Sequence, residues 1–269
     1  IFIEITNSQE NRKTGKQENR TTGQQDHRTT GPQKNSMNLK TIREKLADFS
    51  SYLDSPEGSD ALFLYELPQP FQQHWNLEAS DKKAMYLSCF QNSHTRRFWK
   101  REAFRPLEAM TLFWELDADY TANMFRDLFR EALPVDGRIG RFVFHCDQML
   151  AIYRKANPSS IFNSHYHEQD YWMVSLYLTM QFPGEYALYP DKAFRKNLEF
   201  FQAKPMPTSM PDLERYFKVA RTLYKLMENE ADLIEKHQNR LQPNRHYTDR
   251  CLLLVYEFLC FTADERLVP

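Results

Sequence analysis

Hydrophobic residues recur at helical spacing along most of the chain. The first clear case is an apolar stripe with steps of three and four residues, which is typical of an amphipathic helix. Its members are Leu39, Ile42, Leu46, Phe49 and Leu53. Prolines and N-cap residues divide the rest of this pattern into further predicted helices. These are expected over residues 58–68, 82–92, 94–104, 106–116, 119–133, 138–156, 191–203, 212–228 and 230–240.

Two further segments are apolar on almost every side. They cover residues 168–182 and 247–262. A helix without a polar face is usually buried, so both are predicted to be central helices. Residues 142–146 and 186–189 are alternative candidates for short strands. About ten helices without a convincing alternating strand pattern predict an all-α fold, with a single multi-helix domain over residues 37–262.

The first 36 residues have a different composition. Residues 10–33 repeat an eight-residue unit, and no aliphatic side chain occurs between Ile5 and Met37. Such a segment cannot bury enough surface to offset its chain entropy, so residues 1–36 are predicted to be a disordered tail. We interpret this tail as translated repetitive DNA upstream of the true start at Met37. The alternative is that the tail serves as a weak basic tether. Residues 263–269 are interpreted as a C-terminal end, either a truncation or a linker.

Composition excludes several classes of protein. Hydrophobic residues make up 41% of the chain and aromatic residues 14%, which argues against disorder of the whole chain. Lys and Arg number 35 against 36 Asp and Glu, so no strong overall charge attracts the chain to nucleic acid or membranes. No apolar stretch is long enough to span a bilayer. The four cysteines form no C-x-x-C pair, which favours a reducing cytoplasm and small buried roles for Cys251 and Cys260.

Motifs for common catalytic chemistry are missing from the sequence. It contains no phosphate-binding loop, no dinucleotide fingerprint and no nucleophile elbow, so no cofactor is expected. The best metal candidate combines His165, His167 and Asp170, with His145 and Cys146 close in sequence. Imidazole and carboxylate ligands suit zinc or iron. The same residues could equally cap the helix that follows, so no metal site is assigned.

Basic residues gather in one stretch of the sequence. Arg97, Arg101 and Arg105 follow one another at four-residue spacing, so they share one face of a predicted helix. Cations neutralise phosphates and a neighbouring aromatic ring can stack on an exposed base. The candidate DNA-binding residues are therefore Arg96, Arg97, Trp99, Lys100, Arg101 and Arg105. The alternative is a solvated charged face with Trp99 in the core. Lys192, Arg195 and Lys196 form a secondary basic group.

Four segments of this chain, in order, resemble the N-terminal region of McrB-like restriction proteins. The first is 64–81, where the resemblance rests on Tyr65, Phe71, Gln72, Trp75 and Asp81. The second is 124–142, where it rests on Phe125, Leu128, Arg138, Ile139 and Phe142. The third is 169–190, where it rests on Gln169, Asp170, Ser175, Leu176, Tyr177, Leu178, Pro183, Tyr186 and Tyr189. The fourth is the helix 246–261. Pro190 departs from the family pattern, which commonly has a lysine there.

The resemblance implies a function in restriction or defence. McrB-like proteins are AAA+ nucleotide-hydrolysing proteins that act on DNA, and their motor lies downstream of the region that this chain resembles. The chain is therefore expected to be a DNA-recognition or partner-docking module without catalytic residues of its own. Its expected partners are DNA and a AAA+ motor or nuclease subunit. The alternative is a metal-dependent hydrolase that uses His165, His167 and Asp170.

Overall fold

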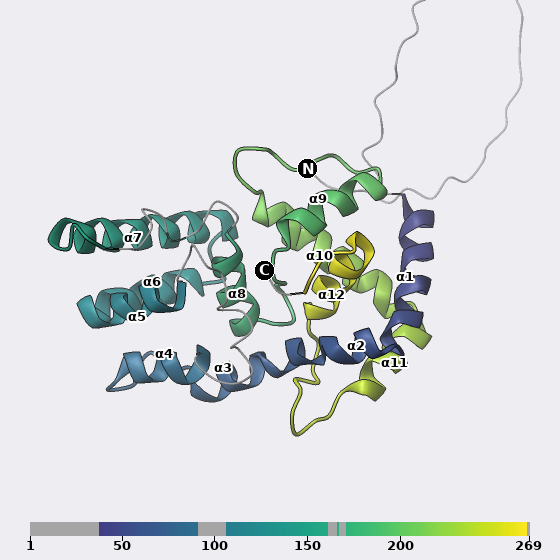
Figure 1. Ribbon diagram of the computed structural model, residues 1–269, viewed down its shortest axis with the longest axis horizontal. Coiled ribbons are helices and arrows are strands. Elements are labelled where there is room, and N and C mark those ends of the chain that lie inside the picture. Colours follow the sequence, from purple (N-terminus) through teal and green to yellow (C-terminus); the bar gives the residue numbers. More distant parts are fainter. Residues whose placement is uncertain (1–37, 91–105, 161–165, 167–170, 268–269) are drawn as a thin grey trace, which may run out of the picture. The chain divides into compact units, whose positions relative to one another are not determined.

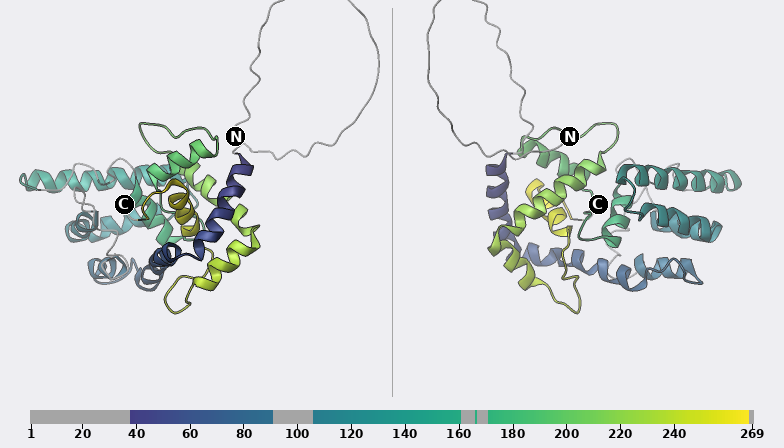
Figure 2. Two further views of the ribbon diagram at one scale, coloured as in Figure 1. Left: turned by 45° about the vertical axis from the view of Figure 1, so that its right-hand side comes forward. Right: turned by 180° about the vertical axis from the view of Figure 1, so that it is seen from behind.

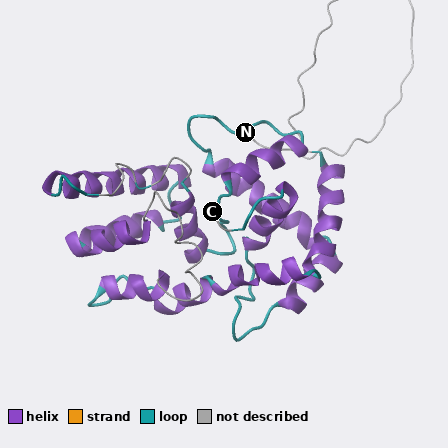
Figure 3. Ribbon diagram, in the orientation of Figure 1, coloured by secondary structure: helices purple, strands orange, loops and turns teal. Residues whose placement is uncertain are grey.

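Helices account for all the regular secondary structure among the residues that the structure describes. A computed structural model describes residues 38–90, 106–160, 166 and 171–267. Within these residues it contains no strand (Figure 3). The elements are α1 (Leu39–Leu53), α2 (Pro56–Asp60), the 3-10 helix η1 (Ala61–Glu66), α3 (Pro68–His74), α4 (Lys82–Phe90), α5 (Pro106–Leu116), α6 (Ala118–Leu128), α7 (Val135–Ala156), α8 (Trp172–Gln181), α9 (Asp191–Phe200), α10 (Leu213–Glu228), α11 (Ala231–Arg240) and α12 (Leu253–Ala263). The predicted all-α class is confirmed.

Several helices begin at the side chains that their sequences suggest. The Asn38 side chain caps α1 by accepting a hydrogen bond from the backbone of Thr41. Asp117 caps α6 and Asp212 caps α10 in the same way. These side chains satisfy backbone N–H groups that have no partner within the first turn of a helix.

Several helix boundaries differ from the sequence prediction, and three of the differences stand out. Pro68 begins α3 rather than ending a helix, because proline is well tolerated in the first turn. Tyr171 has a left-handed φ of 57°, and α8 begins only after it. Residues 247–252 precede the last helix, which begins at Leu253. Residues 142–146, one of the two possible strands, lie within α7, and residues 186–189 form a loop.

The helices fall into two groups (Figures 1 and 2). One group contains α3 to α7, in which successive helices pack on one another and α3 also contacts α8. The other contains α1 and α9 to α12, where α12 packs against α1, α9 and α10. The helix α10 also contacts α7, so the two groups form one continuous domain.

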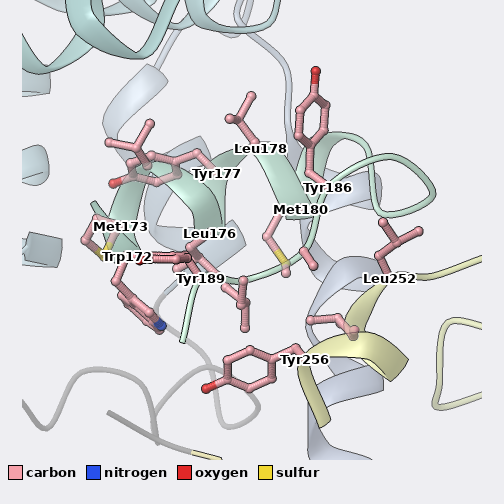
Figure 4. Close-up of a cluster of buried hydrophobic side chains, with 14 of the residues drawn as sticks. Trp172, Met173, Leu176, Tyr177, Leu178, Met180, Tyr186, Tyr189, Leu252 and Tyr256 are labelled. Atoms are coloured by element: carbon pink, nitrogen blue, oxygen red, sulfur yellow. The ribbon is translucent and has the colours of Figure 1, made fainter. Parts of the chain in front are cut away.

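The helix α8 lies in the interior, as its apolar sequence predicts (Figure 4). Every side chain from Trp172 to Met180 is buried. Leu252 and Tyr256 of the α12 region lie close to this helix in Figure 4 and are buried as well. In α12 itself, every side chain from Leu253 to Cys260 is buried. Both predictions of a central buried helix are therefore confirmed, with shorter helices than expected.

Candidate functional site

The primary DNA-binding candidates lie outside the described residues. They are Arg96, Arg97, Trp99, Lys100, Arg101 and Arg105, and the described chain stops at Phe90 and resumes at Pro106. The metal candidates His165, His167 and Asp170 also lie outside the described residues. Both interpretations stay predictions from the sequence.

The secondary basic group is described, and two of its three cations contact the fold. The guanidinium Nε of Arg195 donates to the carboxylate of Asp191 at 2.9 Å, one turn earlier in α9. The Lys196 ammonium donates to the carbonyl oxygen of Ala263 at the end of α12. Lys192 is exposed. The group therefore offers one exposed side chain, while Arg195 stabilises its own helix and Lys196 joins α9 to the end of α12.

Several other cations on the described surface have carboxylate partners. The ion pairs are Lys82–Asp119, Lys83–Glu115, Arg126–Glu78, Arg141–Asp127, Lys218–Glu214, Lys236–Asp54, Arg245–Glu66 and Arg250–Glu185. Both lysines of α4, the last described helix before the basic run, belong to this set. A cation that is already paired with a carboxylate contributes less to phosphate binding. The phosphate either has to displace this carboxylate or is repelled by its negative charge.

The described residues include no group of three side chains suited to hold a metal ion. His145 forms a hydrogen bond through Nδ1 with the Tyr120 hydroxyl at 2.6 Å. Cys146 is fully buried, and burial raises the pKa of its thiol well above the ordinary value. All four cysteines are buried, which confirms the predicted buried roles of Cys251 and Cys260.

A buried ionic cluster joins η1, α11 and α12. It consists of Tyr65, His237, Arg240 and Glu257. Arg240 and Glu257 form a two-point ion pair with N–O distances of 2.5 and 2.9 Å. The Tyr65 hydroxyl donates to the same carboxylate at 2.5 Å, and Arg240 also donates to the carbonyl oxygen of Gly58 at 2.9 Å. The Glu257 side chain is 0% exposed, so these contacts supply the polar partners that water cannot.

The ionic cluster shifts the pKa values of its neighbours. Burial, followed by the negative charge of Glu257, raises the pKa of Tyr65 well above its ordinary value. Burial, followed by the positive charge of Arg240, lowers the pKa of His237 to about 3. At neutral pH the tyrosine is therefore protonated and the histidine is neutral. The cluster holds three elements of the fold together, and neither Tyr65 nor His237 has a pKa near 7 that would suit acid–base catalysis.

A second buried polar group surrounds Arg138 in α7. This side chain is 2% exposed and donates to the carbonyl oxygen of Leu128 and to the Tyr186 hydroxyl, both at 2.7 Å. Tyr186 in turn donates to the Glu131 carboxylate at 2.7 Å. The contacts connect α7 to the end of α6 and to the loop after α8. Their role is to fix these three elements relative to one another.

Three tyrosine hydroxyls meet in the aromatic interior. The tyrosine cluster consists of Tyr86, Tyr166 and Tyr177, and its oxygens are separated by 2.8 Å between Tyr86 and Tyr177 and by 2.5 Å between Tyr166 and Tyr177. Burial raises the pKa values of all three well above normal. The cluster is neutral and inert as an acid at physiological pH.

The residues behind the family resemblance lie mainly in this interior. The Gln72 amide donates to the carbonyl oxygen of Met180 at 2.6 Å, which satisfies the end of α8. The Ser175 hydroxyl accepts a hydrogen bond from the backbone of Tyr189 at 2.9 Å. Trp75 packs against Trp114 and Phe125. These residues position helices, so their pattern reports on the fold rather than on a chemical site.

The ionic cluster was missed by the sequence interpretation. Its signal was Glu257, the single charged residue between positions 251 and 261 in an otherwise apolar helix. A lone carboxylate in such a helix requires a cation and further hydrogen bonds. Nothing in the local sequence identifies Arg240 as its partner, because the two belong to different helices.

Taken together, the described residues define an all-α domain with polar clusters in its interior and several ion pairs on its surface. None of the described helices is long and apolar enough to cross a membrane. Comparison of the chain with protein-family models, with curated proteins and with solved structures finds no match.

Proposed function

We propose that this chain is a DNA-recognition module of a McrB-like restriction or defence system. The observation that carries the proposal is the run from Arg96 to Arg105, which contains five cations and only one acid, Glu102. Several cations on the described surface are paired with carboxylates, whereas this run combines its five cations with a single acid, so it is the strongest candidate for phosphate contacts. The resemblance of the chain to the N-terminal region of McrB-like proteins supports the same function.

The charge of the helical region limits how it can bind. From Met37 onward the chain has 29 Lys and Arg against 32 Asp and Glu. Binding must therefore come from a local patch and be weak, within the range of about 10⁻⁴ to 10⁻⁶ M that is usual for contacts to the phosphate backbone. Trp99 lies within the patch and is the candidate for stacking on an exposed base.

A titration of the full chain with fluorescent duplex and single-stranded DNA at low salt tests the proposal. We expect weak binding to both, with Trp99→Ala costing about 1–3 kcal/mol on single strands while the melting temperature stays unchanged. Loss of the fold in Trp99→Ala would show that Trp99 belongs to the core. Absence of binding to modified and unmodified DNA would refute DNA recognition and favour docking to a AAA+ motor or nuclease subunit.

A further inference from the structure

The loop between α11 and α12 is attached to the rest of the fold mainly by hydrogen bonds. It extends along the lower edge of the fold in Figure 1. Between Gln242 and Tyr247 of this loop, His246 has the one buried side chain. A segment that buries a single side chain can separate from a domain without unfolding it, so its hydrogen bonds decide whether it stays closed.

Two of these hydrogen bonds join the backbone of the loop to η1 and α3. The backbone N–H of Tyr247 donates to the carbonyl oxygen of Tyr65 in η1 at 2.7 Å. The Gln69 amide of α3 donates to the carbonyl oxygen of His246 at 2.9 Å. Both depend on the conformation of the backbone at His246, because they involve this residue and the next one.

The ring of His246 holds this conformation by closing the loop on itself. The backbone N–H of Gln242 donates to His246 Nδ1 at 2.9 Å, and the backbone N–H of His246 donates to the Gln242 carbonyl oxygen at 2.7 Å. A ring nitrogen that accepts a hydrogen bond carries no proton, so the neutral ring has its proton on Nε2. The His246 side chain is 2% exposed, so the closed loop keeps the ring away from water.

The surroundings of the other ring nitrogen favour the neutral ring. Nε2 of His246 is buried without a hydrogen-bond partner among the described residues, and it lies 3.8 Å from Oε1 of Glu66. The same oxygen accepts a hydrogen bond from Arg245 Nε at 2.5 Å, so the charge of the carboxylate is already paired. Arg240 of α11 adds a further positive charge, and α3 contributes only the neutral Gln69 amide.

Protonation of the ring is incompatible with the closed loop. It turns Nδ1 from an acceptor into a donor that faces the backbone N–H of Gln242, so the bond that closes the loop is lost. Burial, as the main cause, lowers the pKa of His246 in the closed loop below its ordinary value of 6.5. The negative charge of Glu66 opposes this shift, and the positive charges of Arg245 and Arg240 support it.

We propose that His246 is a pH-sensitive switch that keeps the 242–247 loop closed on η1 and α3 at neutral pH and releases the loop in mild acid. The closed loop holds the neutral ring, whereas the open loop exposes a ring that takes up a proton at its ordinary pKa. Acid therefore favours the open state. Release breaks the contacts with Tyr65 and Gln69 and brings the buried Glu66 carboxylate into contact with water, while the helices stay folded.

Hydrogen exchange of the full chain at pH 7.5 and pH 5.5, followed by NMR, tests the switch. After correction for the intrinsic pH dependence of exchange, we expect the opening equilibrium at the Tyr247 amide to rise by up to about tenfold at the lower pH. The Phe258 amide in α12 should open far less at both pH values, because it exchanges only when the domain unfolds.

His246→Asn is the matched variant. The asparagine side-chain oxygen can accept the Gln242 N–H as Nδ1 does, but asparagine does not titrate. Opening at Tyr247 should then differ by less than about twofold between the two pH values. His237→Gln should keep the full pH dependence of the loop, which separates this switch from the ionic cluster. A pH dependence that persists in His246→Asn would overturn the proposal.

The original chain provides a second test that needs no variant. At pH 7.5 the nitrogen chemical shifts of the His246 ring should place the proton on Nε2, with Nδ1 as the acceptor. A proton on Nδ1 would contradict the switch. So would a loop that opens less in acid, because the charged ring would then hold the loop closed through Glu66.

Discussion

The ionic cluster and the tyrosine cluster bury polar side chains in different ways. Between η1, α11 and α12 the ionic cluster places a full carboxylate and a guanidinium in the interior, with N–O distances of 2.5 and 2.9 Å. Between α4 and α8 the tyrosine cluster buries neutral hydroxyl groups among aromatic rings. A buried charge that loses its partner is far more costly than a hydroxyl that does so. The difference predicts where the domain tolerates substitution and where it does not.

The largest effect is expected for Glu257→Ala. This change leaves the Arg240 guanidinium buried without its carboxylate, and should lower the free energy of unfolding by about 3–5 kcal/mol. Denaturant unfolding followed by circular dichroism measures it. The matched control is Glu228→Ala, which removes an exposed partner of Arg250 and should cost at most about 1 kcal/mol. If both variants lose the same free energy of unfolding, the buried ion pair contributes no more to stability than an exposed one.

Cavities in the two groups should have similar effects. Leu178 of α8 and Leu253 of α12 are both 0% exposed. Truncation of either to alanine should cost roughly 2–5 kcal/mol, because each leaves a cavity in a close-packed interior. Thermal unfolding of the two variants compares them directly. A loss below 1 kcal/mol at one site only would show that apolar packing, and not only polar chemistry, differs between the groups.

A smaller effect is expected in the tyrosine cluster. Tyr177→Phe removes the middle hydroxyl and leaves Tyr86 and Tyr166 without this partner, at a cost of about 1–3 kcal/mol. A double-mutant cycle with Tyr86→Phe isolates the interaction between the two hydroxyls. The matched control is Tyr52→Phe, since the Tyr52 hydroxyl forms only an exposed hydrogen bond at 3.3 Å. If Tyr177→Phe leaves the free energy of unfolding unchanged, the hydrogen bonds between the three hydroxyls do not stabilise the fold.

The ionic cluster should also make stability depend on pH through His237. Its pKa is about 3 in the folded state against 6.5 ordinarily, so the unfolded chain binds more protons between these values. Acidification from neutral pH therefore destabilises the fold, by about 1.4 kcal/mol at pH 5.5 from this residue. Unfolding at pH 7.5, 6.5 and 5.5 measures the effect. The free energy of unfolding of His237→Gln should fall less between pH 7.5 and pH 5.5. If it falls as steeply as that of the original chain, His237 is not the source of the pH dependence.

The sequence predicted the fold class and its two central helices because these depend on local patterns. An apolar run without a polar face identifies α8 and α12 before any partner is known. The start of α8 could not be predicted, because no local pattern in the sequence indicates the left-handed φ of Tyr171. The ionic cluster was missed because Tyr65, Arg240 and Glu257 meet only after folding. Phe144 in α7 shows the same limit, since it has the hydrophobic character of a core residue and only the fold exposes it.

The salt dependence of DNA binding tests the proposed recognition role most directly. Each phosphate contact contributes about −0.9 to the slope of log K against log salt, so Arg97, Arg101 and Arg105 give at most roughly −3. Arg97→Ala combined with Arg101→Ala should flatten this slope by about 2 and weaken binding alike for all sequences. Lys192→Ala, in the secondary basic group, is the control and should change the slope much less. A slope unaffected by loss of the two arginines, or affected equally by loss of Lys192, would contradict recognition through the basic run.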